Sequence, residues 1–194
     1  MDELFKYKKA ALVNGLCNEY KGYWQAAGSD KLKLFTLAMA QQSIPHLVTY
    51  AYNGIGLTKQ YVLDNFNDYI NGKTPIYDAD GVEGYTYALY ISQNRTLTPL
   101  QDVISCMWCN DVTLHLKAAK CGFIYISNKS DIKLSLDGFN SPRIYLFDES
   151  TLTIEDADET CSATIYKYSD KCKVNYGKFC LSKRIKEHQK ELRL

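Results

Sequence analysis

The chain has 194 residues, of which 46% are hydrophobic, and 23 lysines and arginines nearly balance 22 aspartates and glutamates. This length suits one sizeable domain or two small ones, and the charge balance excludes a strong global attraction to nucleic acid or an anionic membrane. Seven cysteines is an odd number for a complete disulfide framework, so reduced thiols are expected.

The N-terminal part, residues 1–76, is predicted to be a helical module. Apolar side chains recur at three- and four-residue steps after Asp2 and again after Asp30, and both aspartates can cap the helix that follows. Pro45 fits the first turn of a third, short helix, and Thr58 can cap a fourth. Four helices are therefore expected before the pattern changes, and the first of them runs from Asp2 to about Trp24.

Residues 77–100 change to strand-like alternation with glycine turns, and we expect a β-ribbon or connector there.

Residues 101–180 then contain a repeat with a period near twenty. Its corners fall at Asn110, Ser130, Ser150 and Asp170. The first strand after each corner gives two columns, Val112, Ile132, Leu152 and Cys172, then Leu114, Leu134, Ile154 and Val174. A second strand aligns Ile124, Ile144 and Ile165, once a one-residue insertion is allowed in the third block.

A fixed period with matching columns predicts a short β-solenoid, in which each coil stacks on the previous one at roughly 4.8 Å. An antiparallel sandwich of short strands satisfies the same alternation and is the alternative. Column identity favours the solenoid, because each coil must return to the same corner. The chain would hold about three and a half such coils of about 20 residues each.

Both open ends of so short a stack need a cover. We expect the helical module to cap one end and residues 181–194, a basic C-terminal helix or tail, to cap the other. The predicted fold is therefore α+β, with an N-terminal helical module, a short β-solenoid and a C-terminal capping helix.

The sequence contains no convincing catalytic or metal-binding motif. Cys106 and Cys109 have the C-x-x-C spacing of some zinc or redox sites, but no second tight pair follows, and buried thiols are favoured. None of the histidines has a convincing acid or thiol partner nearby; they are His46, His115 and His188. We expect no enzyme activity, no metal and no cofactor.

Three surfaces are candidates for partner binding. Tyrosines that alternate with inward isoleucines are predicted to stack into an exposed ladder, with packing beneath a terminal helix as the alternative: Tyr125, Tyr145 and Tyr166. The C-terminal tail is basic and can contact phosphates or an acidic protein, unless it is a solvated helix: Lys183, Arg184, Lys186, Lys190 and Arg193. An acidic patch for a basic partner, or a solvated edge, contains Asp148, Glu149, Glu155, Asp156, Asp158 and Glu159.

Two stretches, YKKAALVNGLCNEYKGYW and ISCMWCNDVTLHL, resemble a group of small uncharacterised phage and mobile-element proteins of anaerobic bacteria. The likeness covers most of the chain and rests on general pattern. It implies a compact accessory protein that acts inside a bacterial host, and it transfers no catalytic residue. Phage proteins of this kind often bind and block host machinery, CRISPR effectors included.

The sequence and this resemblance together predict a non-enzymatic binding protein, most specifically a phage-encoded inhibitor or modulator of a host defence complex, such as an anti-CRISPR. Its expected partner is a host protein or ribonucleoprotein in the bacterial cytoplasm, with nucleic-acid contact through the C-terminal tail and no membrane contact. The first alternative is a structural component of a phage particle. The second is a carbohydrate-active β-solenoid enzyme, which would need paired carboxylates and a longer groove.

Overall fold

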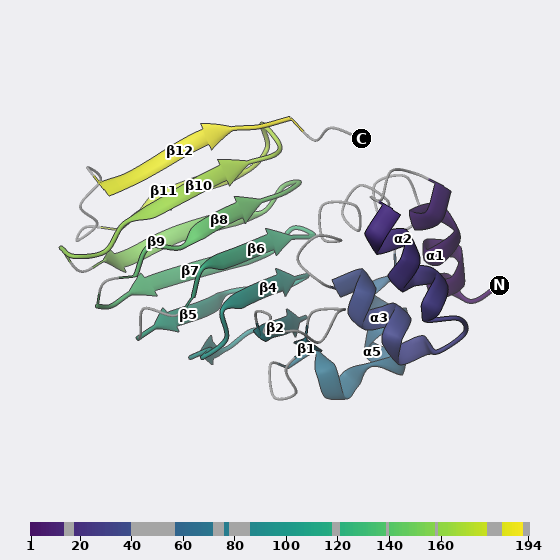
Figure 1. The fold of residues 1–194 in the computed structure, drawn as a ribbon. Coiled ribbons are helices and arrows are strands. Elements are labelled where there is room, and N and C mark those ends of the chain that lie inside the picture. The colour runs from purple at the N-terminus through teal and green to yellow at the C-terminus, as the bar shows by residue number, and fades with distance from the viewer. Residues whose placement is uncertain are drawn as a thin grey trace.

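The computed structural model describes residues 1–13, 18–39, 57–71, 76–77, 86–117, 121–138, 140–157, 159–177 and 184–191. The helices in these residues precede all the strands of the solenoid (Figure 1). They are α1 (Glu3–Val13), α2 (Asn18–Ala26), α3 (Lys31–Met39), α5 (Lys59–Asn65) and the 3-10 helix η1 (Asn67–Tyr69). The short helix predicted after Pro45 lies outside the described residues.

Side chains at the helix starts provide the predicted caps. Asp2 and Asp30 accept backbone N–H groups of the following turn at 3.0 and 3.1 Å, and the Thr58 hydroxyl accepts one at 3.2 Å. Between the helices the core is aromatic, and Phe35 stacks on Phe66 with ring centroids 3.9 Å apart. The helical pattern of the sequence therefore reflects a packed helical region. The single helix predicted from Asp2 to Trp24 is wrong, because this stretch contains two helices, α1 and α2, that contact each other.

From Thr86 onward the described chain is a parallel β-solenoid of about five turns built from two sheets, more turns than the three and a half expected. Sheet A has the order β1 (Ile76–Tyr77), β2 (Thr86–Ile91), β4 (Val103–Met107), β6 (Phe123–Ser127), β8 (Arg143–Leu146), β10 (Ala163–Lys167), β12 (Ile185–Gln189). Sheet B has the order β11 (Lys173–Tyr176), β9 (Thr151–Ala157), β7 (Asp131–Leu136), β5 (Val112–Leu116), β3 (Thr96–Leu97). Neighbouring strands are parallel throughout, except that β1 is antiparallel to β2.

Inward residues of the two sheets form one buried core, and the first three predicted blocks are in the expected register. Ile124 pairs with Ile144, and Ile144 pairs with Ile165. The predicted one-residue insertion is a bulge in β9: Leu134 pairs with Ile154 and Ser135 with Asp156, so the residue between those two partners has no counterpart in β7.

The fourth block departs from the predicted register. Leu152 pairs with Val174 instead of Cys172, so both predicted columns are wrong there by two residues. The bulge in β9 accounts for one residue of this shift. The other lies in the corner between β10 and β11, which is one residue longer than the corner between β8 and β9 and brings Cys172, not Asp170, beside Ser150.

The corners recur because the backbone makes the same turn after successive strands of sheet A. A residue with a positive φ directly follows β2, β4 and β6, and one lies two residues after the end of β8: Ser92, Trp108, Asn128 and Asp148. Asn and Asp adopt this left-handed conformation more readily than most residues. Buried serines then link the coils, because Ser130 Oγ accepts the Cys109 N–H at 3.1 Å and Ser150 Oγ accepts the Ser130 N–H at 3.2 Å.

The C-terminal end differs from the expected capping helix. Residues 184–191 contain strand β12, which pairs in parallel with β10 from Ile185 to Gln189, and the described residues of this segment contain no α-helix. Ile185 lies beside Ala163 and packs against the solenoid core. Pairing with an open sheet edge therefore outweighs the helix propensity of Lys, Glu and Gln.

The helical region covers the other end of sheet A and part of its outer face. Ile91 N–H donates to Ile70 O at 2.9 Å, Asn71 bridges to Tyr90, and β1 pairs along β2. A buried cluster joins helical side chains to outward residues of sheet A, namely Leu89, Ile91, Val103, Met107, Tyr125 and Phe147. In Figure 1 the helices stand at one side of the sheets, and β12 lies at the opposite end of the stack from β2.

Candidate binding surface

Alternate residues of sheet A point out of the solenoid, and from β6 to β12 these are mainly aromatic or basic. The parallel register stacks them in columns. The central column contains Ser105, Tyr125, Tyr145, Tyr166 and His188. The three tyrosines predicted to form a ladder are therefore brought together, and the histidine of β12 extends it.

The rings of this ladder stack face to face. Centroids of Tyr125 and Tyr145 are 4.8 Å apart with planes tilted by 11°, and those of Tyr145 and Tyr166 are 5.2 Å apart with a tilt of 22°. The His188 ring lies 5.4 Å beyond Tyr166. Because the strand spacing is also about 4.8 Å, the faces of the inner rings are occupied by neighbouring rings, and ring edges and hydroxyls are left for a partner.

A second aromatic column runs beside the first. Phe147 and Tyr168 stack with centroids 5.0 Å apart, and Tyr168 lies 6.4 Å from Tyr145. Lys190 continues this column, because its N–H donates to Lys167 O as the N–H of Tyr168 does to Leu146 O one strand earlier. Alternation places Phe147 and Tyr168 two residues after ladder tyrosines, a signal that could have identified both from the sequence.

Burial decreases along the ladder. Tyr125 is only 5% exposed and belongs to the buried cluster that contains the helical side chains, so the alternative of packing beneath helices applies to this residue. Tyr145 and Tyr166 are half-buried, and His188 is exposed. The part of the ladder that a partner can reach therefore lies at the C-terminal end of the stack.

Basic side chains surround this accessible part. Lys190 Nζ lies 5.6 Å from the centroid of the Tyr166 ring, and Arg143 Cζ lies 5.8 Å from that of Phe123, distances at which a cation is attracted to a ring. Lys186 is exposed in β12, and Arg184 is exposed just before it. Lys183 and Arg193, also predicted to bind a partner, lie outside the described residues.

No aspartate or glutamate occupies an outward position in β4, β6, β8, β10 or β12, as far as the described residues extend. Burial raises the pKa of Tyr145 and Tyr168 above the ordinary value of 10.0. Both hydroxyls therefore stay protonated near neutral pH and can donate hydrogen bonds to an anion.

The predicted acidic patch is divided between different environments. Asp148 is 6% exposed, and its carboxylate accepts the N–H groups of Asn128 and Lys129 at 2.5 and 2.9 Å and the Ser150 hydroxyl at 2.9 Å. This acid therefore organises a corner from inside and is not part of an exposed patch. Its neighbour Glu149 is on the surface.

The other described acids of this predicted patch are exposed. Glu149 forms ion pairs with Lys129 at 3.3 Å and Lys171 at 3.4 Å, and the hydrogen bonds from these lysines lower its pKa. Glu155 and Asp156 are exposed in β9 of sheet B, and Glu159 is exposed in the next corner. Asp158 lies outside the described residues.

The C-x-x-C pair is inside the solenoid. Cys106 and Cys109 are free thiols with at most 2% exposure, and a hydrogen bond from Cys106 to Cys109, together with burial, raises the pKa of Cys106. Within the described residues, no group of three or more His, Cys, Asp or Glu side chains is arranged to hold a metal ion.

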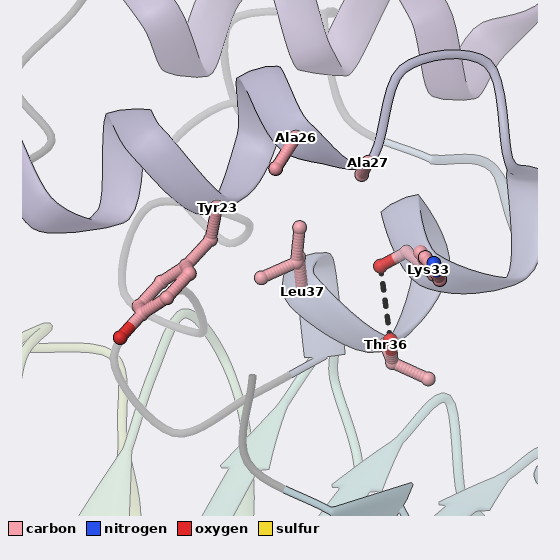
Figure 2. A pocket seen from close by; sticks show the side chains of 6 residues that line it. All are labelled: Tyr23, Ala26, Ala27, Lys33, Thr36 and Leu37. Carbon is pink, nitrogen blue, oxygen red and sulfur yellow. Dashed lines mark hydrogen bonds between the residues drawn. The ribbon is translucent and has the colours of Figure 1, made fainter. Parts of the chain in front are cut away.

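A pocket of about 240 Å³ lies between α2 and α3 (Figure 2). Its lining residues are Tyr23, Ala26, Ala27, Lys33, Thr36 and Leu37. The Thr36 hydroxyl donates to Lys33 O at 2.9 Å, a bond within α3 itself. Among the described residues, the lining has no carboxylate, histidine or thiol.

Comparisons with known proteins add no identity: no family model, curated protein or solved structure matches the chain. The phage or mobile-element origin implied by the resemblance therefore has no support from a match. No helix among the described residues has the length and apolar character needed to cross a membrane.

Proposed function

We propose that the protein is a non-enzymatic binding protein that holds a macromolecular partner on the outer face of β8, β10 and β12. We call this surface the aromatic–basic face, and it consists of Arg143, Tyr145, Tyr166, Tyr168, Lys186, His188 and Lys190. The observation that carries the proposal is the combination there of stacked, accessible tyrosines with basic side chains, with no outward carboxylate among the residues that the structure describes.

The composition of this face suits binding. Tyrosine and arginine are enriched where proteins meet partners, because each offers a large contact area together with hydrogen-bond donors. The stacked rings are already ordered in the free protein, so a partner would lose little affinity to side-chain ordering. Inhibition of a host defence complex is the specific form of binding that the resemblance implies.

Capture from a bacterial host lysate tests the proposal. The tagged full chain, a double variant with Lys186→Gln and Lys190→Gln, and a control with Lys59→Gln and Lys173→Gln would be compared by mass spectrometry. Both control lysines are exposed and lie away from the aromatic–basic face, so the two variants lose the same charge. We expect a partner that the wild type and the control retain and the face variant loses. Equal capture by all three would refute the proposal.

The defence role needs its own assay. The full chain would be expressed in a host that restricts a phage through a CRISPR or other defence system, and plating efficiency would be measured. An inhibitor restores plating, and the aromatic–basic face variant restores it less than the control. Restored plating that is equal for both variants would place the inhibitory contact elsewhere on the molecule.

A further inference from the structure

We infer that the aromatic–basic face binds the phosphate backbone of single-stranded nucleic acid without reading base sequence. The inference rests on the proposed function for the location of the contact, and it adds the chemical class of the partner. It follows from three features of this face: the placement of its charges, its dimensions and the orientation of its rings.

The placement of charge favours phosphate over an acidic protein surface. Every outward side chain of β12 is a lysine or a histidine, and Lys190 continues the row. Protein interface cores are depleted of lysine, whereas lysine and arginine make most of the protein contacts to phosphates. Glu187 points inward, where Lys167 Nζ lies 3.0 Å from its carboxylate and the Tyr176 hydroxyl donates to it, so it does not neutralise the face.

The dimensions suit a short stretch of backbone. Lys186 and Lys190 are four residues apart, which is about 13 Å along an extended strand, and β8 and β12 are two strand spacings, or about 10 Å, apart. Together with Arg143 of the face and the exposed Arg184 directly before β12, these lysines provide four cationic side chains. It would therefore contact about four phosphates, at the lower end of the range for single-strand-binding surfaces.

The ring orientation excludes base intercalation. Neighbouring tyrosines occupy both faces of Tyr145, and Tyr145 and His188 occupy those of Tyr166, so no base can enter the ladder between them. On Tyr145 and Tyr166, ring edges and hydroxyls remain accessible, and the hydroxyls can donate to phosphate oxygens but cannot distinguish bases. Within the described residues from Arg143 to Lys190 that form the aromatic–basic face there is no α-helix, and a projecting helix or β-ribbon is what enters the groove of a duplex.

Fluorescence anisotropy of the full chain tests the inference. The probes are labelled dT20, dA20, a 20-base-pair duplex and poly-glutamate, each titrated at several salt concentrations. We expect dT20 and dA20 to bind with similar Kd, and more tightly than the duplex or poly-glutamate. Contact with about four phosphates gives a slope of log affinity against log salt near −2.8, at about −0.7 for each phosphate.

Variants assign the contact to the face. Lys186→Gln with Lys190→Gln is expected to reduce the slope by about 1.4 and to weaken dT20 binding by about tenfold at low salt. Tyr166→Phe keeps the ring but removes a donor, and about fivefold weaker binding is expected. Lys59→Gln with Lys173→Gln loses the same charge elsewhere and should leave dT20 binding unchanged. Circular dichroism of each variant would check that it keeps the fold.

The outcomes separate this inference from the proposed function. If the face variant loses its lysate partner but binds dT20 as the wild type does, the proposed function stands and the nucleic-acid inference fails. Tighter binding of poly-glutamate than dT20 identifies an acidic protein as the partner, and tighter binding of the duplex overturns the single-strand assignment. If neither the captured partner nor dT20 depends on the face, both proposals fail.

Discussion

The two faces of sheet A are built by alternate residues of the same strands, yet they differ in how much they change along the stack. From β4 to β8 the inner face keeps small or branched apolar residues, such as Ile124 and Ile144 in one column, which Ile165 of β10 continues. The outer face changes from apolar side chains beneath the helices, through stacked tyrosines, to the basic residues of β12.

This difference follows from what each face contacts. Every inward side chain must fit between two sheets, so its size is constrained at each level of the stack. An outward side chain is constrained only by its ladder neighbours and by whatever covers the sheet. The inner face therefore stabilises the fold through its packing. The residues of the outer face can differ from coil to coil and can form a binding surface.

Truncating one side chain on each face gives the largest expected contrast. Ile144→Ala removes a fully buried inward side chain and should lower the free energy of unfolding by about 3 to 4 kcal/mol. Tyr166→Ala, on the outer face one strand away, removes a half-buried ring and should cost about half as much. Urea unfolding of both variants measures the difference. A greater loss for Tyr166→Ala would contradict the division of roles.

Two consecutive acids allow a second comparison of a buried with an exposed side chain. Asp148→Ala removes a buried acceptor of two backbone N–H groups and a hydroxyl, and should cost about 2 to 3 kcal/mol. Glu149→Ala removes only exposed ion pairs with Lys129 and Lys171, and should cost less than about 1 kcal/mol. Thermal or urea unfolding distinguishes them, and equal losses would show that the corner does not depend on the buried carboxylate.

Acid should weaken the contribution of Glu187 at the end of the stack. Partial burial alone would raise its pKa, but the hydrogen bond from Tyr176 and the ion pair with Lys167 outweigh it and hold the pKa below the ordinary 4.5. The charged form therefore stabilises the folded state above that pH, and its contribution is lost as the pH falls through the lowered pKa. Unfolding measured at pH 7 and pH 3 should show a smaller acid-induced loss for Glu187→Gln than for the wild type. An equal loss would mean that these contacts add no stability.

The smallest effect on stability is expected on the aromatic–basic face itself. Lys186→Gln with Lys190→Gln should change the free energy of unfolding by less than about 0.5 kcal/mol, because both side chains are exposed and neither fills the core. Urea unfolding measures this, with Lys59→Gln and Lys173→Gln as control. A large loss would show that the basic residues of β12 are needed for folding and would complicate any reading of the binding assays.

Much of the solenoid was predictable because its inner residues repeat. The isoleucine columns, the serine corners and the insertion in the third block all left a signal at fixed spacing, and Ser130 and Ser150 do stack in the structure. The tyrosine ladder followed from alternation within each strand together with the alignment of the isoleucine column. These are consequences of a backbone that returns to the same position every coil.

The features that could not be predicted occur where the repeat spacing changes or where a segment becomes a strand only because it pairs with a neighbouring strand. β2 pairs with β4 at an offset of sixteen residues, as Tyr87 and Val103 show. A search for a twenty-residue period therefore does not detect the first coil. β12 has few β-forming residues and becomes a strand only because β10 offers it an edge, which also hid His188 from the predicted ladder. Asp148 looked like a surface acid because sequence does not show which backbone N–H groups a carboxylate will meet.

The in-register corners also bear on how such a chain can change length. Asn128 and Asp148 occupy equivalent left-handed positions, and the strands after them pair residue for residue until the bulge in β9. A duplicated copy of residues 128–147, placed directly after the original, would therefore add one strand to each sheet without altering either end. The array would grow by about 4.8 Å, and the tyrosine column would gain one ring. Nothing in the stacking of these coils fixes their number, so duplication and deletion of whole coils are available routes for the evolution of its outer surface.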